Sequence, residues 1–524
     1  MNSRIILAKN IHIDKQYTNV LDYSEEQMLN LCLANKVAEA NNCSFIRANR
    51  SINVAFSYNQ CLQANYIAFQ NPDYSNKWFF AWIDDVIYKG NNNTDITYTI
   101  DSWSTWFDYW QKKVCFINRQ HVNNDTIGIN TIPENLDVGE VVQEDFDEMT
   151  FQVESDEPNF YFAINSTYNP ISKKDFVGVS KINGILQGNW IFIFDVSNVG
   201  ITYINNFLSD VNKDSKIESI KELYILPRFL VDTIGKEQLH KDSTFGDYYC
   251  YLLKESDEKV DLPIVIDRTT SFKDFQPKNN KCFVYPYNYL LASNNIGNNI
   301  IYKYENFNIN DNDKDTIVLD AELSISIGAS VRLVPFNYKG IEKNYNETIP
   351  LAKFPTCSWS SDAFINWLTT NAVNISSTIV STGASLATGN IGSVAGNIAG
   401  LIGQFYQASL LPSIQGGNNN GDVNFSSGKN TFIIYHMRAK TEYLKIIDDY
   451  FTRFGYAIKK LELPNITGRK YWNYIEIGQN EEIGYGEVPS KFMDTINNAC
   501  RRGVTIWHNH ENVGNYALNN TIVS

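Results

Sequence analysis

The feature that most constrains this chain is a long segment without charge. No Asp, Glu, Lys or Arg occurs from 363 to 421, a run of 59 residues in a chain that is 19% charged overall. Two apolar arms flank the turn-like stretch STGASLATGN. As helices, arms of about 17 and 21 residues would be roughly 26 and 32 Å long, about the thickness of bilayer hydrocarbon. We predict an apolar helical hairpin whose membrane-active residues are Phe364, Trp367, Leu368, Ile375, Ile379, Ile391, Gly392, Val394, Gly396, Ile398, Gly400, Leu401, Ile402 and Phe405.

The second arm carries glycines that disfavour a helix in water. Gly392, Gly396, Gly400 and Gly403 together cost a helix about 4 kcal/mol relative to alanine. In lipid, unpaired backbone groups are costly enough to drive the same chain into a helix, and the four-residue glycine spacing lets two helices approach closely. A low-complexity linker and a tightly packed soluble helix pair stay open as alternatives. Because Asn and Gln interrupt the arm, we predict a segment that is stored in the folded particle and inserts later.

Outside this segment the composition favours β structure. The chain contains 31 Tyr and 30 Phe, and aromatic side chains are enriched in strands. We predict a mainly β fold class with α+β parts. Short strands between Asn, Asp, Gly and Pro clusters are expected from about 140 to 351. The expected segments are a β-rich N-terminal domain (1–140), a β-rich middle domain (141–355), the uncharged loop (356–426) and an α+β C-terminal domain (427–524).

Local patterns predict a helix and a hairpin near the N-terminus. The stretch DYSEEQMLNLCLANK carries Ser24 and Gln27 at capping-box spacing, which predicts a helix. The segment 78–100 is predicted to be a hairpin, because Ile96, Tyr98 and Ile100 alternate with polar residues. Three consecutive asparagines at 91–93 supply its turn.

The C-terminal part alternates strands and helices. One helix is expected in TEYLKIIDDYFTRF, which has an apolar face and stops at Gly455. A second begins at Pro489 and Ser490 and ends at Gly503. Strands are expected in TFIIYHM, YAIKKLEL, KYWNYIEI and VTIWH. This order, β-α-β-β-α-β, predicts the ferredoxin-like split motif.

The sequence shows no catalytic constellation. Neither a GxxxxGK[ST] phosphate loop nor an HExxH zinc motif occurs, and the six histidines and scattered cysteines form no recognisable triad. His508 and His510 lie two apart on an expected strand, so simple alternation points both to one face without any metal. We therefore expect a non-enzyme that holds no cofactor.

One acidic turn is a weak metal candidate. Positions 1, 3, 5 and 12 of a calcium loop would be occupied by Asp311, Asp313, Asp315 and Glu322. However, Thr316 stands where such loops need glycine, and the residues that follow favour a strand over a flanking helix. A solvated acidic turn is the simpler interpretation.

Charge and cysteine usage exclude further classes. The formal net charge is −14, and basic residues cluster only in pairs such as Lys112–Lys113. Sequence-specific DNA binding normally needs a basic stripe, so we do not expect it here, whereas passing DNA without holding it stays open. The eight scattered cysteines, with no C-x-x-C pair, predict reduced, buried thiols and folding in a cytoplasm.

Five stretches resemble a known protein family. They are ANYIAFQNPDYSNKWFFAWIDDVIY (64–88), YTIDSWSTWFDYW (98–110), INRQHVNNDTIGINTIPENLDVGE (117–140), FTRFGYAIKKLELPNITGRKYWNYIEI (451–477) and RRGVTIWHNHENVGNYALNN (501–520). In order and spacing they are similar to the tail knob, or distal tail tube, proteins of small, short-tailed, picovirus-type phages with protein-primed genomes. The middle of the chain, about 150 to 350, corresponds only by position.

The resemblance implies a homohexameric, mostly β tube at the distal end of the virion tail, through which genomic DNA leaves without specific binding. It implies contacts with other phage tail proteins and assembly in the host cytoplasm. It also implies an apolar loop that plugs the lumen and then penetrates the host cytoplasmic membrane, and residues 363–421 lie where that loop belongs. Two other classes stay open. A receptor-binding adhesin is favoured by the aromatic content, and a cell-wall hydrolase of the tail tip would need a catalytic constellation.

Overall fold

The computed structural model describes residues 3–41, 43–46, 50–70, 76–150, 160–195, 197–260, 262–293, 299–308, 316–325, 330–336, 338, 357–360 and 431–523. The chain forms two compact units. The first contains Met1–Glu140, Asp274–Tyr287 and Ala439–Ser524, and the second contains Val141–Lys273 and Asn288–Arg438. Strands predominate in both units, so the predicted mainly β fold class is confirmed.

The first unit begins with an antiparallel sheet of seven strands. They are β1 (Arg4–Ala8), β3 (Lys36–Asn41), β4 (Ser44–Ile46), β5 (Ser51–Val54), β6 (Tyr66–Gln70), β7 (Trp78–Gly90) and β8 (Asn93–Ile100). Their order in the sheet is β3-β1-β6-β7-β8-β5-β4. Alternation along β1 sends Ile5 and Leu7 into one hydrophobic cluster and Ile6 and Ala8 into another. Both faces of the sheet are therefore covered.

Three helices accompany this sheet, namely α1 (Glu25–Ala34), α2 (Tyr58–Cys61) and α3 (Ser102–Trp106). The predicted capping box of α1 is confirmed. The Ser24 side chain accepts from the N–H of Gln27, whose side chain accepts from the N–H of Ser24. The predicted hairpin is also confirmed, since β7 and β8 pair from Ala81↔Ile100 to Gly90↔Asn93.

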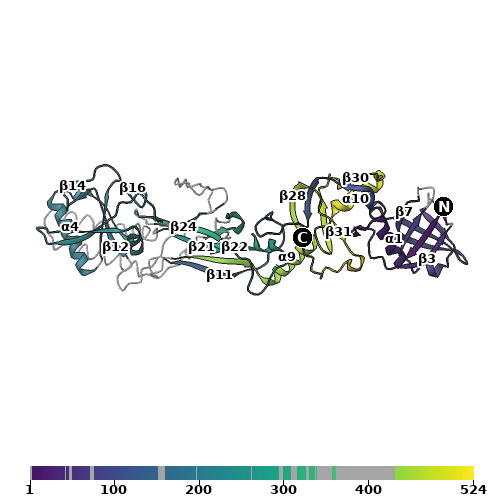
Figure 1. The fold of residues 1–524 in the computed structure, drawn as a ribbon. Helices are drawn as coiled ribbons and strands as arrows, with labels where there is room; N and C mark the ends of the chain where they lie inside the picture. Colours follow the sequence, from purple (N-terminus) through teal and green to yellow (C-terminus); the bar gives the residue numbers. More distant parts are fainter. Residues whose placement is uncertain are drawn as a thin grey trace. The chain divides into compact units, whose positions relative to one another are not determined.

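A second sheet of the first unit combines strands from both ends of the chain, as the dark and yellow ribbons in Figure 1 show. Its order is β2-β31-β29-β10-β28. The strands are β2 (Asn19–Leu21), β10 (Cys115–Gln120), β28 (Tyr456–Glu462), β29 (Trp472–Ile477) and β31 (Val504–Trp507). The helices α9 (Thr441–Phe454) and α10 (Ser490–Arg502) contact β29. A two-stranded sheet joins β9 (Trp110–Lys112) to β30 (Gly484–Gly486).

The predicted ferredoxin-like motif is wrong, although the expected helices and strands occur in the expected order. The first expected strand, β27 (Thr431–Ala439), pairs with β22 (Asn288–Ser293) in a sheet of the second unit. Strands β2 and β10 from the N-terminal part complete the sheet that β27 would have joined. Strand pairing depends on distant segments that compete for the same edges, so element order alone did not determine it.

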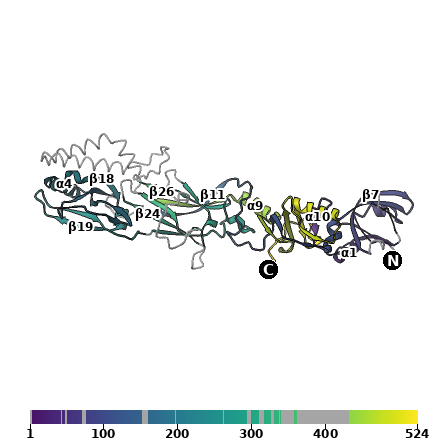
Figure 2. The same cartoon turned by 90° about the horizontal axis from the view of Figure 1, so that it is seen from above.

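The second unit contains three larger sheets. A five-stranded sheet, β18-β12-β17-β20-β19, is covered by helix α4 (Asn198–Lys213), which Figure 2 shows beside its strands, and by α5 (Arg228–Ile234). These strands are β12 (Phe160–Ser166), β17 (Trp190–Phe194), β18 (Ile220–Pro227), β19 (Lys236–Lys241) and β20 (Tyr248–Leu253).

The other two large sheets have four strands each. One has the order β11-β27-β22-β23 and adds β11 (Val141–Thr150) and β23 (Asn299–Tyr302). The other has the order β21-β24-β25-β26, with β21 (Pro263–Asp267), β24 (Thr316–Ser324), β25 (Ser330–Pro335) and β26 (Cys357–Ser360). Short pairs form between β13 (Tyr168–Asn169) and β14 (Lys174–Asp175), and between β15 (Ser180–Ile182) and β16 (Ile185–Gln187).

Candidate functional site

The predicted membrane-active residues, from Phe364 to Phe405, lie outside the described part of the chain. The described strands that flank them are β26 and β27. Among the residues that the structure describes, no helix is long and apolar enough to cross a membrane. The apolar hairpin therefore stays a prediction about residues 363–421.

The acidic turn is described only at its end. Asp311, Asp313 and Asp315 lie outside the described residues, whereas Glu322 lies in β24, opposite Arg332 of β25. The strand expected after the turn is confirmed over Thr316–Ser324. The twelfth position of a calcium loop normally leads into a helix, so the extended backbone here does not fit such a loop.

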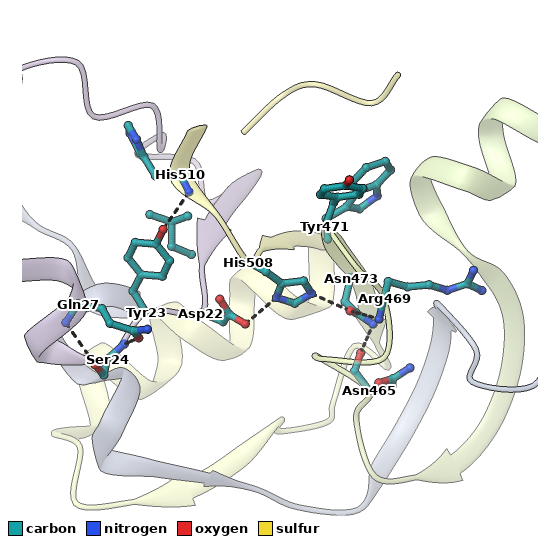
Figure 3. Close-up of polar contacts among 12 residues, drawn as sticks. Asp22, Tyr23, Ser24, Gln27, Asn465, Arg469, Tyr471, Asn473, His508 and His510 are labelled. Carbon is teal, nitrogen blue, oxygen red and sulfur yellow. Dashed lines mark hydrogen bonds and ion pairs between the residues drawn. The ribbon is translucent and has the colours of Figure 1, made fainter. Parts of the chain in front are cut away.

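His508 lies between two hydrogen-bond acceptors (Figure 3). Its Nδ1 is 2.6 Å from Oδ2 of Asp22, and its Nε2 is 3.1 Å from Oδ1 of Asn473. The backbone fixes the Asn473 amide, because Oδ1 accepts from the N–H of Arg469 and Nδ2 donates to the carbonyl of Asn465. Both ring nitrogens of His508 thus face an acceptor oxygen, one on Asp22 and one on Asn473. The contact with Asp22 joins residues 486 positions apart.

His510 has different partners, also from the N-terminal segment. It begins the 3₁₀ helix η8 (His510–Asn512), and its N–H donates to the Tyr23 hydroxyl over 3.0 Å. Its Nε2 accepts from the N–H of His12 over 3.2 Å, and the two imidazoles stack with centroids 5.1 Å apart. Burial lowers the pKa of His510. His508 and His510 therefore serve separate contacts.

A third histidine, His121, is fully enclosed in the first unit. Its Nδ1 accepts from the N–H of Tyr474 over 2.8 Å, and its Nε2 is 3.1 Å from the carbonyl of Thr452. This pattern requires the neutral tautomer with its proton on Nε2. Burial, followed by the nearby charge of Arg469, lowers the pKa of His121 from 6.5 to about 3. The ring thus serves as a neutral crosslink between β29 and α9.

Three buried or half-buried carboxylates hold the segment 278–283, which includes the 3₁₀ helix η5 (Asn280–Phe283). Asp448 of α9 accepts from the N–H groups of Lys278 and Asn279 over 3.0 and 2.9 Å. Asp125 accepts from the N–H of Asn280 over 3.0 Å. Glu134 pairs with the ammonium of Lys281. These contacts anchor the segment Asp274–Tyr287 in the first unit. This segment is far in sequence from the two other parts of that unit, Met1–Glu140 and Ala439–Ser524.

Sequence reasoning missed these carboxylates. One available signal was Asp448, which lies one turn after Leu444 on the apolar face predicted for α9 and is buried with it. An acidic residue within an apolar stripe indicates a specific buried partner. Asp125 and Glu134 lie in irregular structure, where no periodicity marks burial.

Buried thiols are poor nucleophiles in this protein. Cys32, Cys115 and Cys250 are free thiols, and burial raises the pKa of Cys32 to about 12, of Cys115 to about 11 and of Cys250 to about 12. The thiolate is the reactive form, so these groups stay protonated near neutral pH. These three cysteines are therefore packed core residues rather than reactive groups.

The β7–β8 hairpin presents apolar side chains to solvent at its tip. Tyr88 is 62% exposed and Ile87 is 38% exposed. Tyr58 of α2 packs edge-on against Tyr88 with ring centroids 6.3 Å apart. The tip is thus held in place by α2 while its apolar surface remains free.

Two protein-family models match this chain. The family model described as the C-terminal domain of Bacillus phage phi29 tail knob protein gp9 matches residues 253–521, more than half of the chain. The chain belongs to this tail knob protein family. A second family model, the N-terminus of caudoviral major tail proteins, matches residues 1–111.

Relatives of this tail knob protein match along most of their length. It is 24% identical to tail knob protein gp9 of Bacillus phage PZA, over 91% of this chain and 90% of the relative. It is 23% identical to gp9 of Bacillus phage phi29, over 90% of each chain. The solved structure of the bacteriophage C1 tail knob protein, gp12, superposes with a TM-score of 0.58 and 14% identity, covering 99% of this chain and 100% of that one.

The family resemblance read from the sequence is therefore confirmed. This tail knob protein is a structural component of the virion tail of a short-tailed phage. The likeness to the C1 protein extends the common fold to the described part of the middle region, which the sequence matched only by position.

Proposed function

We propose that six copies of this tail knob protein form a ring at the distal end of the tail and that the genome leaves through it. The observation that carries the proposal is the family match over 253–521 together with a tail knob fold over 99% of the chain. As a tail component the ring would contact other tail proteins. The net charge of −14 per chain supports passage of DNA without binding, because like charges repel.

The β7–β8 hairpin supports a role in assembly. Its exposed tip carries Ile87 and Tyr88 on a long pair of strands. Aromatic side chains are enriched at protein interfaces, where they bury a large area with few rotatable bonds. We assign the tip to the contact between neighbouring copies.

The uncharged run supports the second part of the proposal. Residues 363–421 plug the lumen before ejection and penetrate the host cytoplasmic membrane afterwards. The support is the absence of charge over 59 residues, the bilayer-length arms and the glycine spacing. No catalytic role is needed for either step.

Dye release from liposomes tests the membrane step. Replacing Gly396 and Gly400 by leucine raises hydrophobicity, so binding to liposomes should persist. The added side chains hold two helices apart, so release of trapped dye should fall at least about fivefold. The matched control replaces Val394 and Ile398, which lie about 200° around the helix from the glycines, by leucine. This control should release dye like the wild type, and equal release by both variants would contradict the proposal.

A further inference from the structure

A hairpin tip in the second unit brings three metal-ligating side chains together. His240 lies in β19, and Asp242 and Asp247 lie in the turn between β19 and β20. One ligand atom from each residue lies within 4.8 Å of the others. We propose that this tip binds one divalent transition-metal ion of the Mn²⁺, Co²⁺ or Zn²⁺ class.

The ligand groups are positioned by contacts that do not involve a metal. The His240 ring stacks on Tyr249, its cross-strand partner, with centroids 4.3 Å apart and an interplanar angle of 18°. Its Nε2 lies 3.3 Å from Oδ1 of Asp242. The ring plane is therefore fixed by the strand pair, with Nε2 directed toward the turn.

Helix α4 holds the turn itself. The Asn206 side chain donates to the carbonyl of Asp247 over 2.9 Å, and the Ser243 hydroxyl lies 3.1 Å from a carboxylate oxygen of Asp210. Within the turn, the N–H of Gly246 donates to the carbonyl of Ser243, and Gly246 adopts a φ of +109°. These bonds use none of the three ligand groups.

Local charge also favours a cation. Within the described part of the chain, the Asp242 carboxylate pairs only with His240, and the Asp247 carboxylate has no hydrogen bond or ion pair. The neighbouring ammonium of Lys241 is already paired with Asp210 at 2.6 Å. The ammonium of Lys213 binds the Thr244 hydroxyl over 2.6 Å at the same turn, but it forms no ion pair with either carboxylate. A divalent ion would supply the charge that compensates the two carboxylates.

The donor set limits the ion. One imidazole nitrogen and two carboxylate oxygens suit divalent ions that accept mixed nitrogen and oxygen ligands. All three side chains are exposed, so water would complete the coordination shell and the ion can enter freely. Binding would stiffen the tip of the β19–β20 hairpin against α4.

Titration of the purified chain with MnCl₂, followed by the electron paramagnetic resonance signal of free Mn²⁺, tests the proposal. We expect one ion per chain. The variants His240→Ala, Asp242→Asn and Asp247→Asn should each weaken binding at least about tenfold, since the first removes the imidazole ligand and the other two remove a carboxylate charge. Circular dichroism should show unchanged folding, because the replaced side chains face solvent.

Asp257→Asn is the matched control. The side chains of Asp257 and Asp242 are both 82% exposed, and Asp257 pairs with Lys181 instead of lying at the tip. Its replacement removes the same charge and should leave Mn²⁺ binding unchanged. The proposal is overturned if millimolar Mn²⁺ finds no stoichiometric site, or if Asp257→Asn weakens binding as much as Asp242→Asn does.

Discussion

Glu134 shows how one buried carboxylate joins distant parts of the chain. Its side chain is 1% exposed and pairs with Arg119 before it and with Lys281 far after it. It also accepts from the N–H of Ala457 over 2.9 Å. The Lys281 ammonium is equally enclosed, and burial lowers its pKa. Removal of one member from such a group leaves an uncompensated buried charge.

Glu134→Gln should therefore lower the free energy of unfolding by about 3 kcal/mol or more, measured by urea denaturation. The matched control is Glu482→Gln, which breaks a surface pair with Lys113 in the same unit. Exposed ion pairs contribute little, so this control should unfold like the wild type. Equal behaviour of the two variants would show that Glu134 is not anchored as the structure indicates.

His121 predicts a specific dependence of stability on pH. Its pKa is about 3 in the folded protein against an ordinary 6.5. Between these values only the unfolded chain binds the proton, so the free energy of unfolding falls by up to about 1.4 kcal/mol per pH unit as the pH decreases. The stabilisation is fully present above about pH 6.5 and is lost progressively below it.

His121→Gln tests this dependence. Glutamine can still accept from Tyr474 and donate to Thr452, but it does not titrate. Urea unfolding at about pH 7 and pH 4.5 should show a smaller loss of stability in the variant than in the wild type. If both lose the same amount, the buried neutral imidazole is not the source of the acid sensitivity.

At the scale of elements, α9 ends where only glycine fits. Gly455 adopts φ 63° and ψ −152°, a region essentially restricted to glycine. A Cβ atom there would overlap the carbonyl of Gln120 in β10. The helix stop that the sequence predicted is thus also a close contact between two distant elements.

Gly455→Ala should lower the free energy of unfolding by at least about 2 kcal/mol more than Gly514→Ala. Gly514 also has a positive φ, +84°, but a Cβ atom there meets nothing within 4 Å. The difference between the two variants reports the contact with Gln120 together with the glycine-only backbone conformation of Gly455. Thermal unfolding that ranks the two variants equally would contradict this packing.

Local sequence patterns predicted the helices, strands and turns well, but they did not predict which distant segments contact one another. The capping residues Ser24 and Gln27, the asparagine turn before β8 and Gly503 after α10 are read from a few neighbouring residues, and the structure confirms each. The partner of β27 depends on β22, which lies far away in sequence. The contact between His508 and Asp22 spans almost the whole chain, so no local pattern reveals it.

At the scale of the whole molecule, assembly should depend on the hairpin tip. Tyr88→Glu places a charge where we assign the contact between copies, so the ring should dissociate toward monomers in mass photometry. Tyr485→Glu is the matched control, because Tyr485 is 60% exposed against 62% for Tyr88. The control should keep a particle of about six times 59.9 kDa. If the ring dissociated in Tyr485→Glu but not in Tyr88→Glu, the contact between copies would not lie at the hairpin tip.

The most direct test of the central claim, a tail knob ring that conducts the genome, is a projection image of the purified chain in the electron microscope. We predict class averages with six-fold symmetry and a central opening. A stable monomer at micromolar concentration and neutral pH, with no ring in any class average, would contradict the account.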